Sequence, residues 1–177
     1  MKYELTDERH TNDSRLRRIR ALRDIPRFGV AAGDVGGFVE SEGNLSQGGD
    51  CWVSGSARVY GLALVYGSAQ VYGSARVCGS ARVCDSALVY GSALVCDSAR
   101  VKRQDHVLTL GPVGGHSATL FRTEDGHQIQ AGCTLTDLDG LRGVAVEEFG
   151  EASPLMGEVD AVIGLFAARI KSWEVWA

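Results

Sequence analysis

The sequence lacks an apolar run long enough to span a membrane, and its first residues show no basic, apolar and small-residue leader. We therefore expect no membrane segment and a cytoplasmic protein. The chain also lacks a large excess of either charge, with a formal net charge of -4 and an isoelectric point near 5.5. That balance argues against a general polyanion binder, so nucleic acid is not an expected partner.

The motifs of common catalytic sites are also absent. The sequence has no P-loop, no dinucleotide-binding fingerprint and no paired-carboxylate site. Cys133 lies between an expected strand and an expected helix, and it could act as a thiolate with His116 or His127 as its base. No orienting group for such a base is identifiable, so a structural cysteine is favoured. We therefore predict a protein that is not an enzyme and that holds no cofactor or metal.

The sequence does contain a strict repeat between Cys51 and Lys102. Valine stands at positions 53, 59, 65, 71, 77, 83, 89, 95 and 101, and alanine at 57, 63, 69, 75, 81, 87, 93 and 99. Ala and Val are two residues apart, so on an extended backbone both point to one side, and Gly or Asp followed by Ser forms the corner. Each unit is too small to bury its own apolar side, so the units are expected to stack into a solenoid.

These units resemble the hexapeptide-repeat proteins, in which a branched aliphatic residue fills each inward site and a small residue follows four positions later. Val59 with Ala63 and Val83 with Ala87 show that pattern, and the resemblance covers roughly residues 38–101. It implies a mainly β fold containing a left-handed parallel β-helix with three units per turn, so that residue i lies above residue i+18. The left-handed sense rests on the resemblance, because the period alone does not give it.

The expected stacking divides the outward residues among three faces. The first carries Trp52, Gln70 and Leu88 beside Ser54, Tyr72 and Tyr90, the second Arg58, Arg76 and Leu94 beside Tyr60, Cys78 and Cys96, and the third Leu64, Arg82 and Arg100 beside Tyr66, Cys84 and Lys102. The first face bears no charge, and an exposed apolar strip of this kind is typical of a contact surface. We take Trp52, Tyr72, Leu88 and Tyr90 as candidate interaction residues. The alternative is that another part of the chain covers this face.

Two cysteines of the repeat are separated by one expected turn. They are Cys78 and Cys96, and Cys84 lies on the neighbouring face. The first two are close enough for a disulfide or a shared soft metal. No further histidine or cysteine completes a tetrahedral set, so we favour the simpler interpretation that Cys and Tyr alternate as residues of moderate size at one outward position.

Residues 1–36 are expected to cap the coil of residues 37–103, because an open end of a β-helix exposes unpaired backbone groups. Within residues 15–23 the apolar positions fit helical spacing and also a short alternation, so periodicity does not settle helix against strand. The basic residues there suggest nucleic-acid binding, but nearby acidic residues dilute the charge. A solvated face of the cap is the simpler role.

Residues 104–177 are expected to form a small α/β domain. Residues 106–110, 117–122 and 127–131 fit short strands, and residues 134–150 and 155–173 fit helices, with Thr136 or Asp137 as a helix cap. Trp173 and Trp176 are expected to anchor this domain or an interface, and both are kept as candidate interaction residues.

The lead-in and the tail carry a second resemblance. Its residues are Gly33-Asp34-Val35-Gly36-Gly37-Phe38-Val39-Glu40-Ser41-Glu42 before the repeat, and Leu108-Thr109-Leu110-Gly111-Pro112 and Phe121-Arg122-Thr123 after it. They resemble a group of phage and prophage proteins with a β-rich cap, hexad repeats and a small α/β tail. This resemblance implies a strand for residues 15–23 and a phage-encoded protein in the cytoplasm of a bacterial host.

Many enzymes with hexapeptide repeats are acyltransferases, in which a histidine on the coil acts as the general base. This coil has no histidine, because His10, His106, His116 and His127 all lie outside it, and no long loop interrupts the repeat. An acyltransferase is therefore the least favoured function.

Two function classes remain. The first is a non-enzymatic, phage-encoded binding protein that engages a host protein or protein complex, with inhibition of a defence-system component as one form. The second is a self-assembling structural protein that forms a homo-oligomer, such as a dimer or trimer. DNA mimicry is a version of the first and is disfavoured, because it needs a dense acidic surface whereas the coil carries mainly arginine.

Overall fold

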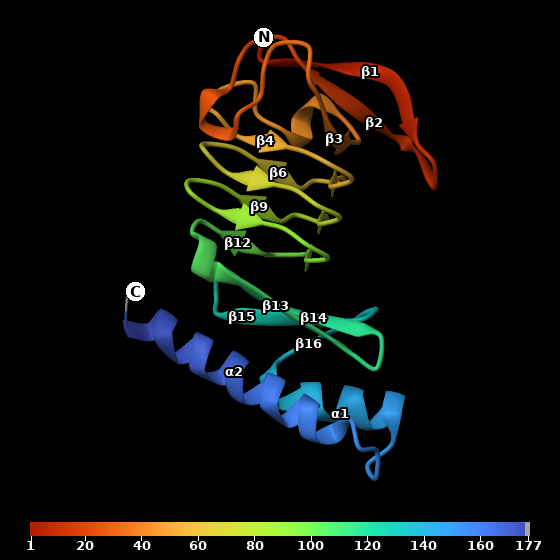
Figure 1. The fold of residues 1–177 in the computed structure, drawn as a ribbon. Coiled ribbons are helices and arrows are strands. Elements are labelled where there is room, and N and C mark those ends of the chain that lie inside the picture. Colours follow the sequence, from red (N-terminus) through yellow and green to blue (C-terminus); the bar gives the residue numbers. More distant parts are fainter. Residues whose placement is uncertain (176–177) are drawn as a thin grey trace.

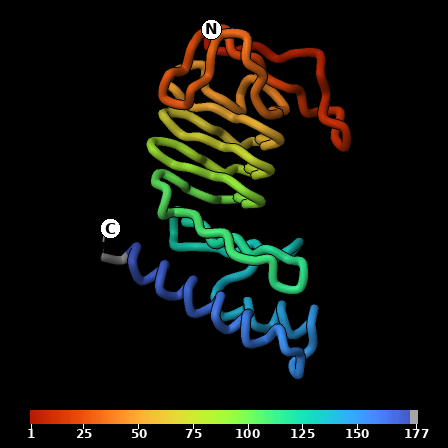
Figure 2. The backbone as a smooth tube through the Cα atoms, in the orientation of Figure 1, coloured from red at the N-terminus to blue at the C-terminus, as the bar shows by residue number. Residues whose placement is uncertain are grey.

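Figure 1 shows a computed structural model of the protein, which describes residues 1–175. Three parts follow one another: an N-terminal hairpin and loop, a parallel β-solenoid of about 4 turns, and a four-stranded sheet with two helices. The backbone tube in Figure 2 passes through them in that order. The predicted class, mainly β with a solenoid and a small α/β region, is confirmed. Among the described residues no helix is long and apolar enough to cross a membrane.

The N-terminal part is built on an antiparallel hairpin of β1 (Tyr3–His10) and β2 (Asp13–Ala21). β2 also pairs with β3 (Val35–Val39), which in turn pairs in parallel with the coil strand β5 (Arg58–Val59), so cap and coil share one six-stranded sheet. The arginine-rich segment is therefore a strand, as the second resemblance implied. Arg17 donates to the backbone oxygen of Thr6 and Arg18 to that of Gly36, each at 2.8 Å. Both guanidinium groups therefore have hydrogen-bond partners within the N-terminal part.

The coil consists of short parallel strands joined by corners. They are β4 (Trp52–Val53), β5 (Arg58–Val59), β6 (Leu64–Val65), β7 (Gln70–Val71), β8 (Arg76–Val77), β9 (Arg82–Val83), β10 (Leu88–Val89), β11 (Leu94–Val95) and β12 (Arg100–Val101). Every third strand pairs in register, which gives the ladders β4–β7–β10, β5–β8–β11 and β6–β9–β12. The predicted stacking of residue i on residue i+18 and the three predicted faces are confirmed. The hand of the coil stays a prediction from the resemblance.

The inward valine and alanine rows fill the interior of the coil. The repeat valines from Val53 to Val101 are 0% exposed, and the alanines from Ala57 to Ala99 are at most 1% exposed. The corners adopt positive φ, which glycine tolerates, and Asp85 and Asp97 adopt it as well, with φ of 55° and 50°. Because every inward site is occupied, functional groups of the coil must lie on its outer faces.

The C-terminal part follows a short 3-10 helix at Gln104–His106; two others cover Pro26–Phe28 and Glu42–Asn44. Its antiparallel sheet consists of β13 (Val107–Val113), β14 (His116–Arg122), β15 (His127–Ala131) and β16 (Thr134–Thr136). The helices α1 (Leu138–Phe149) and α2 (Met156–Val175) pack on the sheet. The first helix was predicted from residue 134, which is wrong, because residues 134–136 extend the sheet. Asp137 is the N-cap, since its carboxylate accepts from the Gly140 N–H at 2.8 Å.

Hydrogen bonds from the flanking parts cover both ends of the coil. At the first turn the Asn44 side-chain amide donates to the carbonyl oxygens of Gly61 and Ala63, at 3.0 and 2.9 Å. At the last turn the backbone N–H of Leu94 donates to the hydroxyl of Thr119 at 3.2 Å. Such bonds satisfy backbone groups that an open sheet edge leaves unpaired. One face of the C-terminal sheet lies against the last turn, and the helices cover its other face (Figure 1).

Candidate functional site

The face built from β4, β7 and β10 carries a pair of stacked tyrosines. Tyr72 and Tyr90 follow strands that lie one above the other, and their rings are 5.4 Å apart between centroids with an angle of 16° between planes. Tyr90 is 57% exposed, whereas Tyr72 and the neighbouring Leu88 are partly buried. We call these three residues, Tyr72, Leu88 and Tyr90, the tyrosine patch. Their backbone is held by the ladder bonds of the coil, so the aromatic surface is rigid.

Trp52, which was predicted to belong to this contact surface, is only 1% exposed. It joins the same buried cluster as Tyr3 and Ile25 from the N-terminal part, with Phe28 and Val30 packed against that cluster. The alternative, in which another part of the chain covers this face, is therefore correct for the first turn, where Trp52 lies. The prediction failed at Trp52 because the outward position of a first turn is also the surface on which a cap packs.

Trp173 is also buried, at 4% exposure. Its indole N–H donates to the backbone oxygen of Asp105 at 2.8 Å, and its ring meets that of His106 at 6.1 Å between centroids. Trp173 therefore ties α2 to the segment that joins the coil to the C-terminal sheet, which is the anchoring role predicted for it. Trp176, the other terminal candidate, lies outside the described residues.

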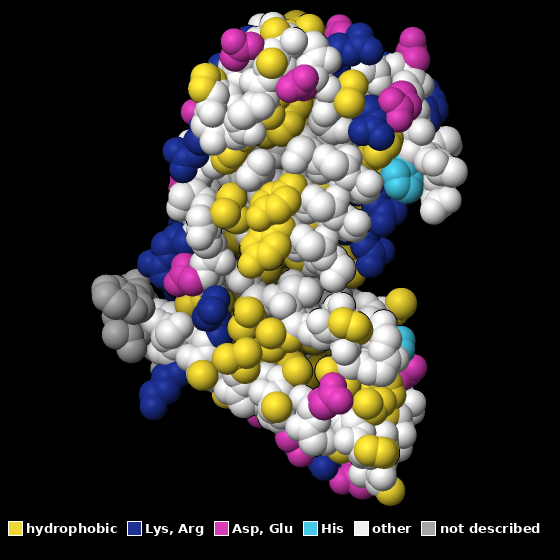
Figure 3. All heavy atoms as spheres, in the orientation of Figure 1, with side chains coloured by type: hydrophobic (Ala, Val, Ile, Leu, Met, Phe, Trp, Pro, Cys, Tyr) yellow, Lys and Arg dark blue, Asp and Glu magenta, His cyan; other side chains and the backbone are white. Residues whose placement is uncertain are grey.

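Two arginines stand on the face next to the tyrosine patch. Arg58 and Arg76 are paired in register on β5 and β8, and Arg76 lies just past the corner that follows Tyr72. Neither forms an ion pair with an acidic side chain that the structure describes. Like charges directly opposite each other on a sheet are destabilising, and this pair has no acidic side chain among the described residues to offset that repulsion. Figure 3 shows hydrophobic side chains gathered on the middle of the coil, with Lys and Arg at its edges.

Cys78 and Cys96 lie on the same ladder as these arginines, and both are free thiols. The neighbouring Cys96 thiol lowers the pKa of the Cys78 thiol to about 7, and the same neighbour raises the pKa of Cys96, whose own S–H donates to Gln130 Oε1 at 3.2 Å. Tyr60 beside them has its pKa raised to about 12, mainly by burial and then by its hydrogen bond with Cys78. Over residues 1–175 no group of histidine, cysteine and acidic side chains is placed to hold a metal. The arrangement is a row of side chains of moderate size along one outer ladder of the coil.

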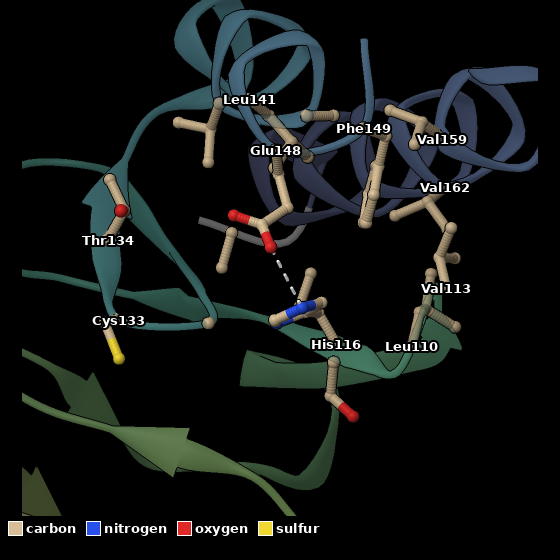
Figure 4. Close-up of a pocket in the computed structure, with 16 residues that line it drawn as sticks. Leu110, Val113, His116, Cys133, Thr134, Leu141, Glu148, Phe149, Val159 and Val162 are labelled. Carbon is tan, nitrogen blue, oxygen red and sulfur yellow. Dashed lines mark ion pairs between the residues drawn. The ribbon is translucent and has the colours of Figure 1, made fainter. Parts of the chain in front are cut away.

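In the C-terminal part the structure brings together two residues that sequence reasoning did not connect. His116 Nε2 on β14 lies 3.3 Å from Glu148 Oε1 on α1, so the histidine has an acidic partner after all. Cys133, the candidate nucleophile, is exposed and turns away from His116 in Figure 4. The three side chains thus do not form a nucleophile, base and orienting group in this conformation. No sequence signal marked Glu148, which is one of several acidic residues on an amphipathic helix.

Beside His116 the C-terminal part contains a cavity of about 250 Å³, lined mainly by aliphatic side chains of the sheet and both helices (Figure 4). The described residues therefore carry two separate features, the tyrosine patch on the coil and this cavity in the C-terminal part. In comparisons with known proteins, no protein-family model and no curated protein sequence matches the chain.

Proposed function

We propose that this is a non-enzymatic binding protein that holds a partner protein on the tyrosine patch. The observation that carries the proposal is the stacked, exposed pair Tyr72 and Tyr90 on a rigid ladder. Tyrosine supplies a large contact area with few rotatable bonds, so little side-chain entropy is lost on binding. A rigid backbone adds preorganisation, since the patch need not rearrange to meet its partner.

The charges around the patch favour a partner with acidic residues at its rim. Interfaces commonly combine an apolar, aromatic centre with a polar rim. The patch supplies the aromatic centre, and Arg58 and Arg76 on the adjacent face supply unpaired positive charge. A single-stranded nucleic acid fits less well, because a base cannot enter between two rings whose centroids are 5.4 Å apart.

The resemblance to phage and prophage proteins supports a bacterial host protein as the partner. On this proposal the protein acts in the host cytoplasm, and occupying a surface of a defence-system component is one way in which it would act. Such an inhibitor needs no catalytic group of its own.

Affinity capture from host lysate with patch variants tests this proposal. Tyr72→Glu and Leu88→Glu place a charge in the patch, and Leu64→Glu places the same charge on another face, at a similarly half-buried outward position. We expect a stoichiometric partner that is captured by the wild type and by Leu64→Glu, and lost from both patch variants. The captured protein, once purified, should bind again with an affinity that falls as salt rises, because the rim contact is electrostatic.

Light scattering on the same samples separates the alternative. A discrete homo-oligomer that Tyr72→Glu dissociates, with no captured protein, would show that the patch joins copies of this chain and would contradict the proposal. Equal capture by folded wild type and patch variants would show that the contact lies elsewhere.

A further inference from the structure

The cavity in the C-terminal part lies at a seam between two hydrophobic clusters. Leu120, Ile129, Leu141, Phe166 and Trp173 form the centre of one cluster, and Ala145, Met156 and Val159 form the other. Side chains from both clusters line the cavity, whose volume is about 250 Å³. Alanine at 118, 131 and 145 leaves this space unfilled. Protein interiors are normally close-packed, so an apolar space of this size is a place for an apolar ligand.

The mouth of the cavity carries one polar pair. His116 and Glu148, 3.3 Å apart, are about half exposed, with side-chain accessibilities of 49% and 56%, and the His116 ring packs 5.9 Å from that of Phe149. Two glycines shape this mouth. A Cβ on Gly114 would lie 2.5 Å from the Phe149 ring, and a Cβ on Gly132 would lie 3.4 Å from His116 Nδ1. A side chain at Gly114 would displace the Phe149 ring at the rim, whereas one at Gly132 would come into van der Waals contact with the His116 ring.

The lining also limits the chemistry of the ligand. An engineered cavity of about 150 Å³ holds benzene, and drug-sized ligands need at least about 300 Å³, so this cavity suits on the order of ten carbon atoms. An anionic head group would meet the Glu148 carboxylate and be repelled. A cationic head would have to compete with His116 for the Glu148 carboxylate. An uncharged head that donates and accepts hydrogen bonds suits both side chains.

We propose that the C-terminal cavity binds a small amphipathic molecule with an apolar body and an uncharged hydroxyl or amide head, the head resting on His116 and Glu148. The site is separate from the tyrosine patch and does not depend on a partner protein.

The test uses the full chain and the fluorophore N-phenyl-1-naphthylamine, which brightens in apolar sites, with 1-octanol and octanoate as competitors. We expect the fluorophore to bind and 1-octanol to displace it, with octanoate at least about ten-fold weaker. Ala145→Leu fills the cavity and should weaken fluorophore binding by at least about ten-fold. Ala168→Leu, an exposed alanine on α2, is the matched control and should bind as the wild type does.

Two results would overturn the proposal: wild-type affinity in a folded Ala145→Leu protein, or displacement by octanoate as strong as by 1-octanol. Circular dichroism shows whether Ala145→Leu is folded. If it is not, amide chemical shifts of the wild type titrated with 1-octanol still decide the matter. Shifts at Ala131, Gly132 and Val159 are expected, whereas shifts confined to the tyrosine patch would refute the site.

Discussion

The coil and the C-terminal part bury their apolar residues in different ways. In the coil the repeat valines and alanines fill the inward sites of all three ladders, and none of those side chains is more than 1% exposed. In the C-terminal part the apolar residues form two clusters with a cavity of about 250 Å³ at their seam. A repeat that stacks identical units can fill its interior completely, so only its outside is free for binding. A non-repeating sheet with two helices follows no such rule, and here it leaves an apolar hollow that opens to solvent beside His116 and Glu148.

The largest expected effect comes from a charge inside the filled coil. Val77 is 0% exposed and lies between the valines of neighbouring turns. Val77→Asp buries a carboxylate with no cation to pair with, and we expect it to lower the free energy of unfolding by at least about 4 kcal/mol, measured by urea denaturation. Arg76→Asp, the adjacent outward residue, should change it by less than about 0.5 kcal/mol. Equal effects of the two substitutions would mean that the coil interior is not closed.

A smaller effect is expected when the same substitution, Ala to Leu, is made in the coil interior and in the cavity of the C-terminal part. Ala81 lies inside the coil at 0% exposure, and Ala145 lines the cavity. Ala81→Leu has no space for the added carbons and should destabilise the protein by about 3 kcal/mol. Ala145→Leu fills empty space and should stabilise it by up to about 1 kcal/mol. Thermal and urea unfolding of both variants check this, and a loss of similar size at both positions would remove the distinction between the regions.

The smallest expected effect concerns the junction of the two regions. His106 is buried there, with Nδ1 accepting the Lys102 N–H at 3.3 Å and Nε2 without a partner among the described residues. Burial lowers the pKa of His106 below its usual value. The unfolded chain therefore takes up the proton first as the pH falls through about 6.5, and the folded state loses stability in that range.

Replacing the histidine isolates this contribution. From about pH 7.5 to about pH 5.5, the wild type should lose more of its free energy of unfolding than His106→Asn, whose amide oxygen can still accept the Lys102 N–H. Urea denaturation at several pH values measures the difference. Parallel pH profiles for the two proteins would show that His106 is not buried in its neutral form.

Some of the site was visible in the sequence and some was not. The period predicts that Tyr72 and Tyr90, which are 18 residues apart, lie next to each other on adjacent turns, and the two rings do stack. The burial of Trp52 depends on the N-terminal part, whose buried residues, such as Tyr3 and Ile25, belong to the same cluster and obey no period. The partnership of His116 with Glu148 likewise depends on how α1 crosses the sheet.

The sequence by itself determined the coil: its strands, corners, register and three faces, because a fixed period repeats the same local choice on every turn. It also determined the strands predicted at residues 106–110, 117–122 and 127–131 and most of both helices, whose patterns are local. Only the tertiary structure decided which outward residues stay exposed, that residues 134–136 join the sheet, and that a cavity remains beside His116. These features arise from contacts between segments distant in the chain, and no local pattern of side chains encodes how two such surfaces meet.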